Sequence, residues 1–456
     1  MNPDHLQYLD YGQLHEGRLR QHQADGVAFM MATPKTMCAD PVGAGKTVQA
    51  AGVIAHLVEA GVVDPSRPVL WLTSDSQLAH QTTVELRRFL PGLTVRCLAG
   101  RRDLDSRANE DVRRLALNTP AHVKVMTFSQ WLARHTLWEG PRPVVILDEV
   151  SQLKGGGKQH AAVLQATSTA ERVHAFTATL YENSPMDVWH VYALLHLPHL
   201  PGWAAFAQQY VQWQVFDNGR RPTGWLNPGA AAAFRDLTAG HYFRRAEALA
   251  DLLRPEYVRH DEWVPPSNTQ ASQLRWADTH IKDPLARQQR HRAVVTGQPG
   301  GLSTRAKHAA YLINRLATAD PMTKVLLIAE SLDELDAIAN DLKELRIGYV
   351  ELRGSTGKGD RPGLVEEFRD DPNMHVLLGS KVVERGLNLQ FAGHLVSVGV
   401  PDNPARLQQQ IGRIVRHGSP FAEAHHWVVL SDCDLDRSAL KRVERKEAEA
   451  ALLTTS

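Results

Sequence analysis

The segment CADPVGAGKTVQ, residues 38–49, constrains the fold of this chain more than any other feature. It joins an apolar run that predicts a strand to an amphipathic run that predicts a helix, through the glycine-rich loop 40–47. Gly43 and Gly45 allow backbone N–H groups to wrap around a phosphate, and the following helix directs its N-terminus at the anion. This loop in this setting predicts nucleotide binding within an α/β fold.

Each position of the loop has an expected role. Lys46 is expected to reach the β- and γ-phosphates of ATP, and the Thr47 hydroxyl is expected to ligate Mg²⁺. The loop departs from the usual pattern only at its first position, Asp40. The expected nucleotide-binding residues of the loop are Pro41, Val42, Gly43, Ala44, Gly45, Lys46 and Thr47.

The segment VVILDEVSQLKG, residues 144–155, supplies the second half of a hydrolytic site. Its apolar run predicts a strand that ends in Asp148 and Glu149. Asp148 is placed to hold Mg²⁺, and Glu149 to orient and deprotonate an attacking water. A strand that merely ends in surface acids is the alternative, and the phosphate loop upstream in the same lobe argues against it.

Apolar runs and helical patterns alternate in two series, over residues 36–200 and again over 324–430. This alternation predicts two α/β lobes, each a mostly parallel sheet with helices on both faces. Between them, 201–320 predicts a largely helical insertion with a linker, in which 216–229 is typical of turns. The expected domains are residues 1–200, 201–320, 321–432 and a C-terminal helix over 433–456.

Composition excludes several classes of protein. The sequence contains no run of about 18 apolar residues, so it predicts no membrane span. Its N-terminal segment lacks the pattern of a signal peptide. Three scattered cysteines, Cys38, Cys97 and Cys433, argue against a disulfide framework or a zinc site and indicate a reducing compartment. The net charge of +1 does not by itself predict a nucleic-acid partner, although a basic groove is compatible with it.

The segment QQQIGRIVRHG, residues 408–418, places Arg413 and Arg416 three positions apart, which predicts one face of a short helix. Guanidinium groups at a γ-phosphate neutralise the charge that develops during hydrolysis, an effect of about 10³–10⁵ in rate. The alternative is two arginines on the surface of a helix near the end of the chain.

The motifs, taken in order, resemble those of helicase superfamily two, above all its Snf/Swi branch of double-stranded DNA translocases. LRQHQADGVAFM (19–30) is similar to "LRxYQxxGV", and DEVSQLKG (148–155) to "DEAHxxKN". FTATLYENSPMDVWHVYALL (176–195) is similar to "LTGTPxxNxxxELWxLL", and HYFRRAEALADLL (241–253) to "LRRxKxxV". QQQIGRIVRHGS resembles "QAxGRxxRxGQ". About nine such segments follow one another over residues 19–420.

The resemblance implies two RecA-like lobes and an ATP-dependent DNA translocase or helicase that hydrolyses ATP to ADP and phosphate with Mg²⁺. It implies that Gln23 reads adenine and that Arg413 and Arg416 reach the γ-phosphate from the second lobe. Contacts with the nucleic-acid backbone carry no base information, so we expect binding to duplex DNA without sequence preference. The expected contact residues are Ser74, Gln77, Thr127, Ser380, Lys381 and Arg385.

We expect a cytoplasmic monomer of bacterial or viral origin, without membrane association and recruited through another protein. Two other functions stay open. One is a strand-separating DNA or RNA helicase, and the other is a non-catalytic ATP-binding switch, against which the intact Lys46, Asp148, Glu149, Arg413 and Arg416 argue. The aromatic residues of the insertion are expected to form a core rather than a platform for stacking bases.

Overall fold

The computed structural model divides into two compact units, residues 1–251 with 448–456, and residues 252–447. It describes residues 6–453 apart from 101–103, 105–107, 217–218, 246–254, 298–302, 358–359, 381–382, 384–386, 388, 402 and 417. Residues 201–251 of the expected insertion belong to the first unit and 252–320 to the second. The four-domain division from the sequence stays a prediction, which limited proteolysis would test.

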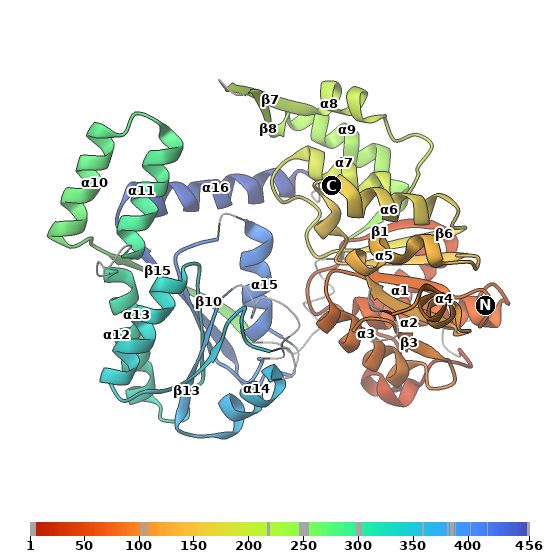
Figure 1. Ribbon diagram of the computed structural model, residues 1–456, viewed down its shortest axis with the longest axis horizontal. Coiled ribbons are helices and arrows are strands. Elements are labelled where there is room, and N and C mark those ends of the chain that lie inside the picture. The colour runs from red at the N-terminus through yellow and green to blue at the C-terminus, as the bar shows by residue number, and fades with distance from the viewer. Residues whose placement is uncertain are drawn as a thin grey trace. The chain divides into compact units, whose positions relative to one another are not determined.

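The first unit is built on a seven-stranded sheet in the order β3-β4-β2-β5-β6-β1-β9, in which all neighbours are parallel. Because the strands are parallel, their carboxyl ends meet at one edge of the sheet; Figure 1 labels β1, β3 and β6 among its strands. The strands are β1 (Lys35–Cys38), β2 (Val69–Thr73), β3 (Val95–Cys97), β4 (Val123–Thr127), β5 (Val144–Asp148), β6 (Arg172–Phe176) and β9 (Tyr242–Phe243).

Helices cover both faces of this sheet, as alternating parallel strands and helices require. One face packs against α1 (Gln21–Ala32), α2 (Lys46–Glu59) and α3 (Ser76–Phe89), through buried residues such as Val27, Ile54 and Leu86. The other face packs against α4 (Glu110–Asn118), α5 (Phe128–Arg134), α6 (Gly157–Ser168) and α7 (Pro185–Ala193). Fully buried strand residues such as Leu70 and Trp71 point to opposite faces of the sheet.

The first part of the insertion contains a hairpin that the sequence does not predict. Helices α8 (Trp203–Tyr210) and α9 (Pro228–Thr238) flank the antiparallel pair β7 (Val211–Phe216) and β8 (Gly219–Trp225). The prediction of turns over 216–229 is therefore wrong for 219–225. Trp225 ends β8, and its ring lies within an aromatic core with Phe206 and Phe234. The expectation that aromatic residues of the insertion form a core is confirmed for Phe206 and Trp225, whereas Trp203 is 46% exposed.

The second unit is built on a six-stranded parallel sheet in the order β10-β15-β14-β11-β13-β12. The edge strand β10 was not predicted from the sequence. Its residues alternate between exposed and partly buried, so it lacks the apolar run of a central strand. The strands are β10 (Glu256–Val264), β11 (Val325–Ala329), β12 (Gly348–Leu352), β13 (Met374–Gly379), β14 (His394–Val398) and β15 (Glu423–Ser431).

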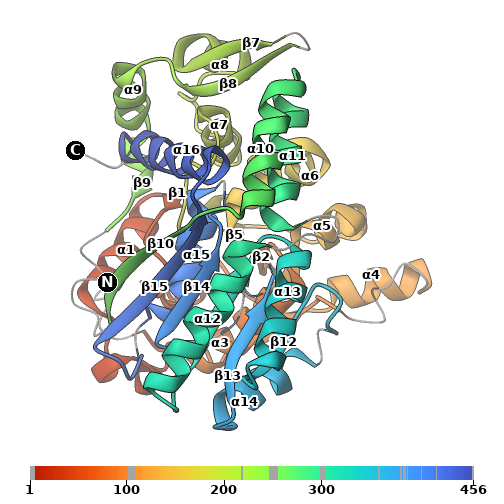
Figure 2. The same cartoon turned by 90° about the vertical axis from the view of Figure 1, so that its left-hand side faces the viewer.

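Helices also cover both faces of the second sheet. One face packs against α12 (Thr304–Ala319) and α13 (Leu332–Glu344), which lie across it in Figure 2. The opposite face packs against α14 (Arg361–Asp370) and α15 (Pro404–Ile414). The remaining helices are α10 (Asn268–His280), α11 (Pro284–Thr296) and α16 (Asp434–Ala451). The prediction of two α/β lobes, each a parallel sheet between helices, is confirmed.

Within the described residues, no helix is both long enough and apolar enough to cross a bilayer.

Candidate ATP site and nucleic-acid interface

Two predicted site segments and one further motif segment leave neighbouring strands of the first sheet. The phosphate loop follows β1, Asp148 ends β5, and Thr177 follows β6, which lies between them. The backbone N–H of Thr177 donates to the carbonyl of Cys38 at 3.0 Å, so the β6 and β1 ends are joined directly. The parallel topology therefore gathers these residues at one edge of the sheet, where α/β proteins bind ligands.

The phosphate loop has the backbone conformation that its glycines predict. Gly43 and Gly45 have φ values of +87° and +78°, in the left-handed region that favours glycine. Gly45 precedes the first residue of α2, so the first-turn N–H groups of that helix face the loop. The ammonium of Lys46 donates to the carbonyls of Asp40 and Pro41 at 2.9 and 3.1 Å, which holds it over the loop.

Asp148 and Glu149 form an adjacent pair of acidic side chains whose charges repel each other. Burial of the carboxyl group, and next the negative charge of Glu149, raise the pKa of Asp148 to about 7, while the charge of Lys46 acts in the opposite direction. Glu149 has φ 52° and ψ 46°, a left-handed conformation that costs about 1–3 kcal/mol for a residue other than glycine. It starts the short 3₁₀ helix Val150–Leu153. Backbone strain of this kind is typical of functional sites.

The donor set of the site suits a divalent cation. Asp148 and the Thr47 hydroxyl offer the hard oxygen ligands that Mg²⁺ prefers, and a bound cation would stabilise the charged form that burial disfavours at Asp148. The residues present therefore fit Mg²⁺, which Thr47 and Asp148 would hold.

Gln23 lies against the phosphate loop and is only 8% exposed. Its side-chain oxygen accepts from the N–H of Arg20 at 3.1 Å, and its amide nitrogen packs against Gly45, where a side chain would collide with it. The neighbouring His22 ring nitrogen lies 2.9 Å from the carbonyl of Ala44. Gln23 thus contacts the loop itself, and its contact with adenine stays a prediction.

A buried ion pair that sequence reasoning missed joins the segments after β5 and β6. The ammonium of Lys154 pairs with the carboxylate of Glu182, which is 4% exposed. Nearby, the hydroxyl of Thr177 donates to the carbonyl of Thr179 at 2.9 Å and accepts its N–H at 3.0 Å. The two segments are thereby fixed to each other beside the acidic pair. The only signal in the sequence was the lysine of the segment 148–155.

The nucleic-acid candidates of the first unit lie at adjacent strand ends, because Thr73 of β2 pairs with Thr127 of β4. Ser74 is half-buried, and its hydroxyl donates to Asp75 at 3.1 Å. Thr127 is 2% exposed, and its hydroxyl caps α5 by accepting from the N–H of Gln130 at 3.2 Å. The half-buried Gln77 lies in the first turn of α3. These residues thus follow or end adjacent strands, but the Thr127 hydroxyl is already engaged in capping α5.

The candidates of the second unit are only partly described. Ser380 directly follows β13, whereas Lys381 and Arg385 lie outside the described residues. Arg413 lies on α15 and donates to the carbonyl of Leu387 at 2.9 Å. The prediction that Arg413 and Arg416 share one helical face is wrong, because α15 ends at Ile414. Val415 has ψ 83°, which turns the chain out of the helix before Arg416.

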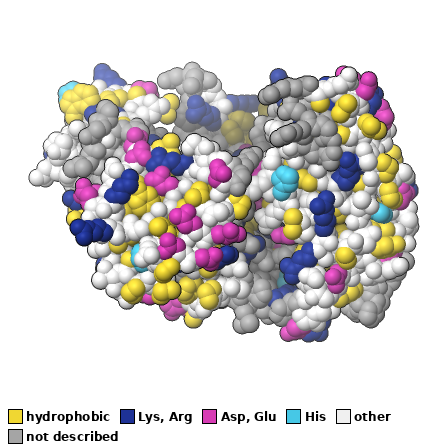
Figure 3. Space-filling model, turned by 60° about the horizontal axis from the view of Figure 1, so that its bottom comes forward, with side chains coloured by type: hydrophobic (Ala, Val, Ile, Leu, Met, Phe, Trp, Pro, Cys, Tyr) yellow, Lys and Arg dark blue, Asp and Glu magenta, His cyan; other side chains and the backbone are white. Residues whose placement is uncertain are grey.

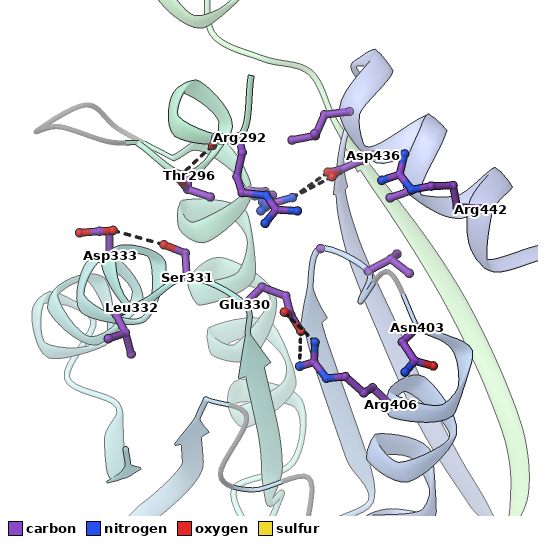
Figure 4. Close-up of a pocket in the computed structure, with 15 residues that line it drawn as sticks. Arg292, Thr296, Glu330, Ser331, Leu332, Asp333, Asn403, Arg406, Asp436 and Arg442 are labelled. Atoms are coloured by element: carbon purple, nitrogen blue, oxygen red, sulfur yellow. Dashed lines mark hydrogen bonds and ion pairs between the residues drawn. The ribbon is translucent and has the colours of Figure 1, made fainter. Parts of the chain in front are cut away.

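A pocket of about 500 Å³ lies within the second unit, beyond the carboxyl ends of β11 and β14 (Figure 4). β11 and β14 are adjacent strands whose following connections lead to opposite sides of the sheet. Open α/β sheets bind ligands at such a switch point. Its lining residues include Arg292, Arg305, Glu330, Ser331, Asp333, Asn403, Arg406, Asp436 and Arg442.

Internal ion pairs shape this pocket. Arg406 pairs with Glu330 through two nitrogen–oxygen contacts of 3.0 and 2.8 Å. Arg305, which is 4% exposed, binds Asp436 at 2.8 Å. Arg292 and Arg442 extend into the pocket from α11 and α16, as Figure 4 shows. The pocket is therefore lined by both acidic groups and arginines, several of which are paired with one another.

Charges of both signs are interspersed on the face of the molecule shown in Figure 3, in keeping with the net charge of +1. Affinity for a polyanion would therefore depend on local groups rather than on the net charge.

Two family models match the chain in sequence order. The DEAD/DEAH box helicase model matches residues 20–188, and the helicase conserved C-terminal domain model matches residues 307–418. The chain belongs to helicase superfamily two. The motifs described above resemble those of the Snf/Swi-like branch of this superfamily.

The chain is similar to the DNA annealing helicase and endonuclease ZRANB3 of Homo sapiens, with 23% identity over 90% of this chain and 38% of the relative. It is also similar to the RNA polymerase-associated protein RapA of Pseudomonas putida, with 26% identity over 91% of this chain and 47% of the relative. The chain thus spans less than half the length of these curated relatives. A solved structure, the SWI2/SNF2 ATPase core of Sulfolobus solfataricus in complex with dsDNA, aligns with a TM-score of 0.46 at 18% identity, covering 100% of this chain and 97% of that chain.

Proposed function

We propose that this chain hydrolyses ATP to ADP and phosphate in order to move along duplex DNA without reading its sequence. The observation that carries the proposal is the convergence of the phosphate loop, the Asp148–Glu149 pair and the Thr177 segment on three neighbouring strands of one sheet. A nucleotide-binding switch needs the loop, but it does not need a strained glutamate beside a metal-binding aspartate.

In this proposal each residue of the first unit has a defined task. Loop N–H groups and Lys46 bind the β- and γ-phosphates, and Thr47 and Asp148 hold Mg²⁺. Bound Mg²⁺ would neutralise charge on the phosphate oxygens. Glu149, held off the strand direction by its left-handed backbone, orients the attacking water and accepts its proton.

The second unit supplies the arginines. We assign the γ-phosphate contact to Arg416 and a bracing role to Arg413, because the Arg413 guanidinium already donates to the carbonyl of Leu387. Arg416 lies beyond the last turn of α15, where the chain is no longer constrained by helical geometry.

DNA would bind through backbone phosphates at Ser74, Gln77 and Ser380, and at Lys381 and Arg385 outside the described residues. The pocket beyond β11 and β14 adds Arg292 and Arg442 as candidates for a phosphate contact. The relatives include a DNA annealing helicase, which supports DNA rather than RNA as the partner. Recruitment by a partner protein, a monomeric state and a cytoplasmic location belong to the same proposal.

Steady-state ATPase rates without nucleic acid, and with duplex DNA, single-stranded DNA and RNA, test this function. We expect the strongest stimulation with duplex DNA, together with displacement of a third strand from a triplex and no displacement of a strand from a duplex. Stimulation by single-stranded DNA or RNA with strand displacement would instead identify a strand-separating helicase. Nucleotide binding without hydrolysis under all four conditions would identify a switch.

A further inference from the structure

We propose that Arg245 is a positioning residue that holds the phosphate loop in its nucleotide-binding shape through the buried carboxylate of Asp40. The proposal rests on the proposed ATPase function. It also explains the one position at which the loop departs from the usual sequence pattern.

Asp40 is fully buried, and polar groups surround its carboxylate. One oxygen accepts from the backbone N–H of Arg245 at 2.9 Å, and the other accepts from the Arg245 guanidinium at 2.6 Å. The second oxygen also accepts from the Gln49 amide at 2.9 Å. Removing one partner of such a buried pair leaves an uncompensated charge, which is far more harmful than removing both partners.

The Arg245 guanidinium also reaches the two helices that flank the loop. It donates to the side-chain oxygen of Gln49 on α2 at 3.0 Å and to the carbonyl of His22 on α1. It stacks over the ring of Phe243 at 4.6 Å from the ring centre. One side chain therefore ties together the first residue of the loop, the helix after it and the helix before it.

The backbone on both sides of the contact is fixed as well. Strand β9 pairs with β1, and the N–H of Ala39 donates to the carbonyl of Phe243 at 2.9 Å. Arg245 is thereby held beside the start of the loop. In sequence it stands a few residues before Leu252, where the second compact unit begins.

The Asp40 contact extends to the catalytic lysine. The Asp40 side chain binds Arg245 while its carbonyl accepts from the Lys46 ammonium at 2.9 Å. Without Arg245, an unneutralised carboxylate would stand at the base of a site that binds a triphosphate. We therefore expect weaker nucleotide binding through both charge repulsion and a displaced loop.

Gly26 provides an independent observation for the same contact. A side-chain carbon at Gly26 on α1 would come within 3.0 Å of both the Gln49 amide and the Arg245 guanidinium. The absence of a side chain there gives these two groups the space they occupy. Gly26→Ala would therefore disturb the contact sterically, without changing any charge.

The first test measures the dissociation constant of Mg²⁺–ADP by calorimetry. Arg245→Gln should raise it by about tenfold or more, a change of at least 1.4 kcal/mol in binding. The double variant Asp40→Asn/Arg245→Gln removes both charges and should recover most of the affinity. The exposed neighbour Arg244→Gln is the matched control and should bind as the unchanged chain does. The rescue by the double variant separates positioning from a general structural role.

The second test keeps the proposal falsifiable if Arg245→Gln does not fold. Gly26→Ala should raise the same dissociation constant severalfold, whereas Gly240→Ala should not, because nothing lies within 4 Å of a carbon added there. Equal affinity of Gly26→Ala and Gly240→Ala, or of Arg245→Gln and Arg244→Gln, would overturn the proposal. A chain that binds no nucleotide in its unchanged form would instead overturn the proposed function.

Discussion

At the scale of the residue, the candidate site combines residues that are adjacent in sequence with features that residue type alone does not indicate. Gly43, Gly45 and Lys46 lie on one continuous turn, so the sequence predicts their arrangement. The left-handed Glu149 adds a feature that residue type does not reveal. In the first unit, the groups expected to bind phosphate therefore lie on the loop after β1, and the acidic pair lies at the end of β5.

Substitutions of Lys46 and Glu149 should separate nucleotide binding from hydrolysis. Lys46→Ala removes a cation from the phosphates and should lose affinity for ATP. Glu149→Gln keeps the shape but removes the base, so it should bind ATP with near-normal affinity and hydrolyse it about 10²–10⁴-fold more slowly. Calorimetry and single-turnover hydrolysis measure the two effects. Normal hydrolysis by Glu149→Gln would contradict the assigned role.

The two arginines of the second unit should behave differently. Arg416→Ala should leave ATP binding nearly intact and reduce hydrolysis by about 10³-fold or more, because an arginine finger acts on developing charge. Arg413→Ala should also reduce the thermal stability of the chain, since its bond to the carbonyl of Leu387 is lost. The melting temperature and the turnover number of each variant distinguish the two roles. If both variants changed the two quantities to the same extent, the separate roles of Arg413 and Arg416 would be refuted.

At the scale of the element, apolar runs predicted the central strands well because both faces of a parallel sheet are buried. The sequence did not predict strand β10, because it is an edge strand whose residues are mostly exposed or half-buried and include several charged ones, so it lacks an apolar run. Likewise, the contact between Arg245 and Asp40 spans 205 positions, so no local pattern indicates it. What the sequence could not predict depends on tertiary packing, as with Trp225 in the hairpin and Arg416 beyond the end of α15.

Two histidines of the second sheet, the buried His426 and the half-buried His394, should make that unit sensitive to acid. Burial, helped by the charges of Arg259 and His260, lowers the pKa of His426 to about 3, and burial next to His425 lowers that of His394 to about 4. As the pH falls, the two histidines bind protons first in the unfolded chain, where their pKa is close to the ordinary value of about 6.5. Stability is therefore fully present above that pH and is lost as the pH falls towards 4.

Urea unfolding between pH 4.5 and 7.5 measures this loss. Each of the two histidines contributes at most about 1.4 kcal/mol per pH unit to the slope of the unfolding free energy. His426→Asn should flatten the slope, and His280→Gln, which alters an exposed residue of α10, should leave it unchanged. An identical slope in His426→Asn and the unchanged chain would show that this histidine does not titrate on unfolding.

At the scale of the whole molecule, the net charge of +1 bears on the proposed binding to DNA. Long-range attraction is weak at that charge, so affinity must come from contacts with individual phosphates. Each phosphate contact releases counterions, so the logarithm of the affinity should fall linearly with the logarithm of salt concentration, with a slope of about 0.9 per phosphate. Because such contacts carry no base information, duplexes of equal length and different sequence should bind within about threefold of one another. Fluorescence anisotropy on two unrelated duplexes between 50 and 200 mM salt measures both quantities.

Replacing Arg292 and Arg442 with glutamine should reduce the salt slope by about one or two phosphates, if the pocket beyond β11 and β14 contacts DNA. The substitutions should also weaken the binding of both duplexes equally. A loss confined to one sequence would mean that these arginines read bases, and an unchanged slope would remove the pocket from the DNA interface.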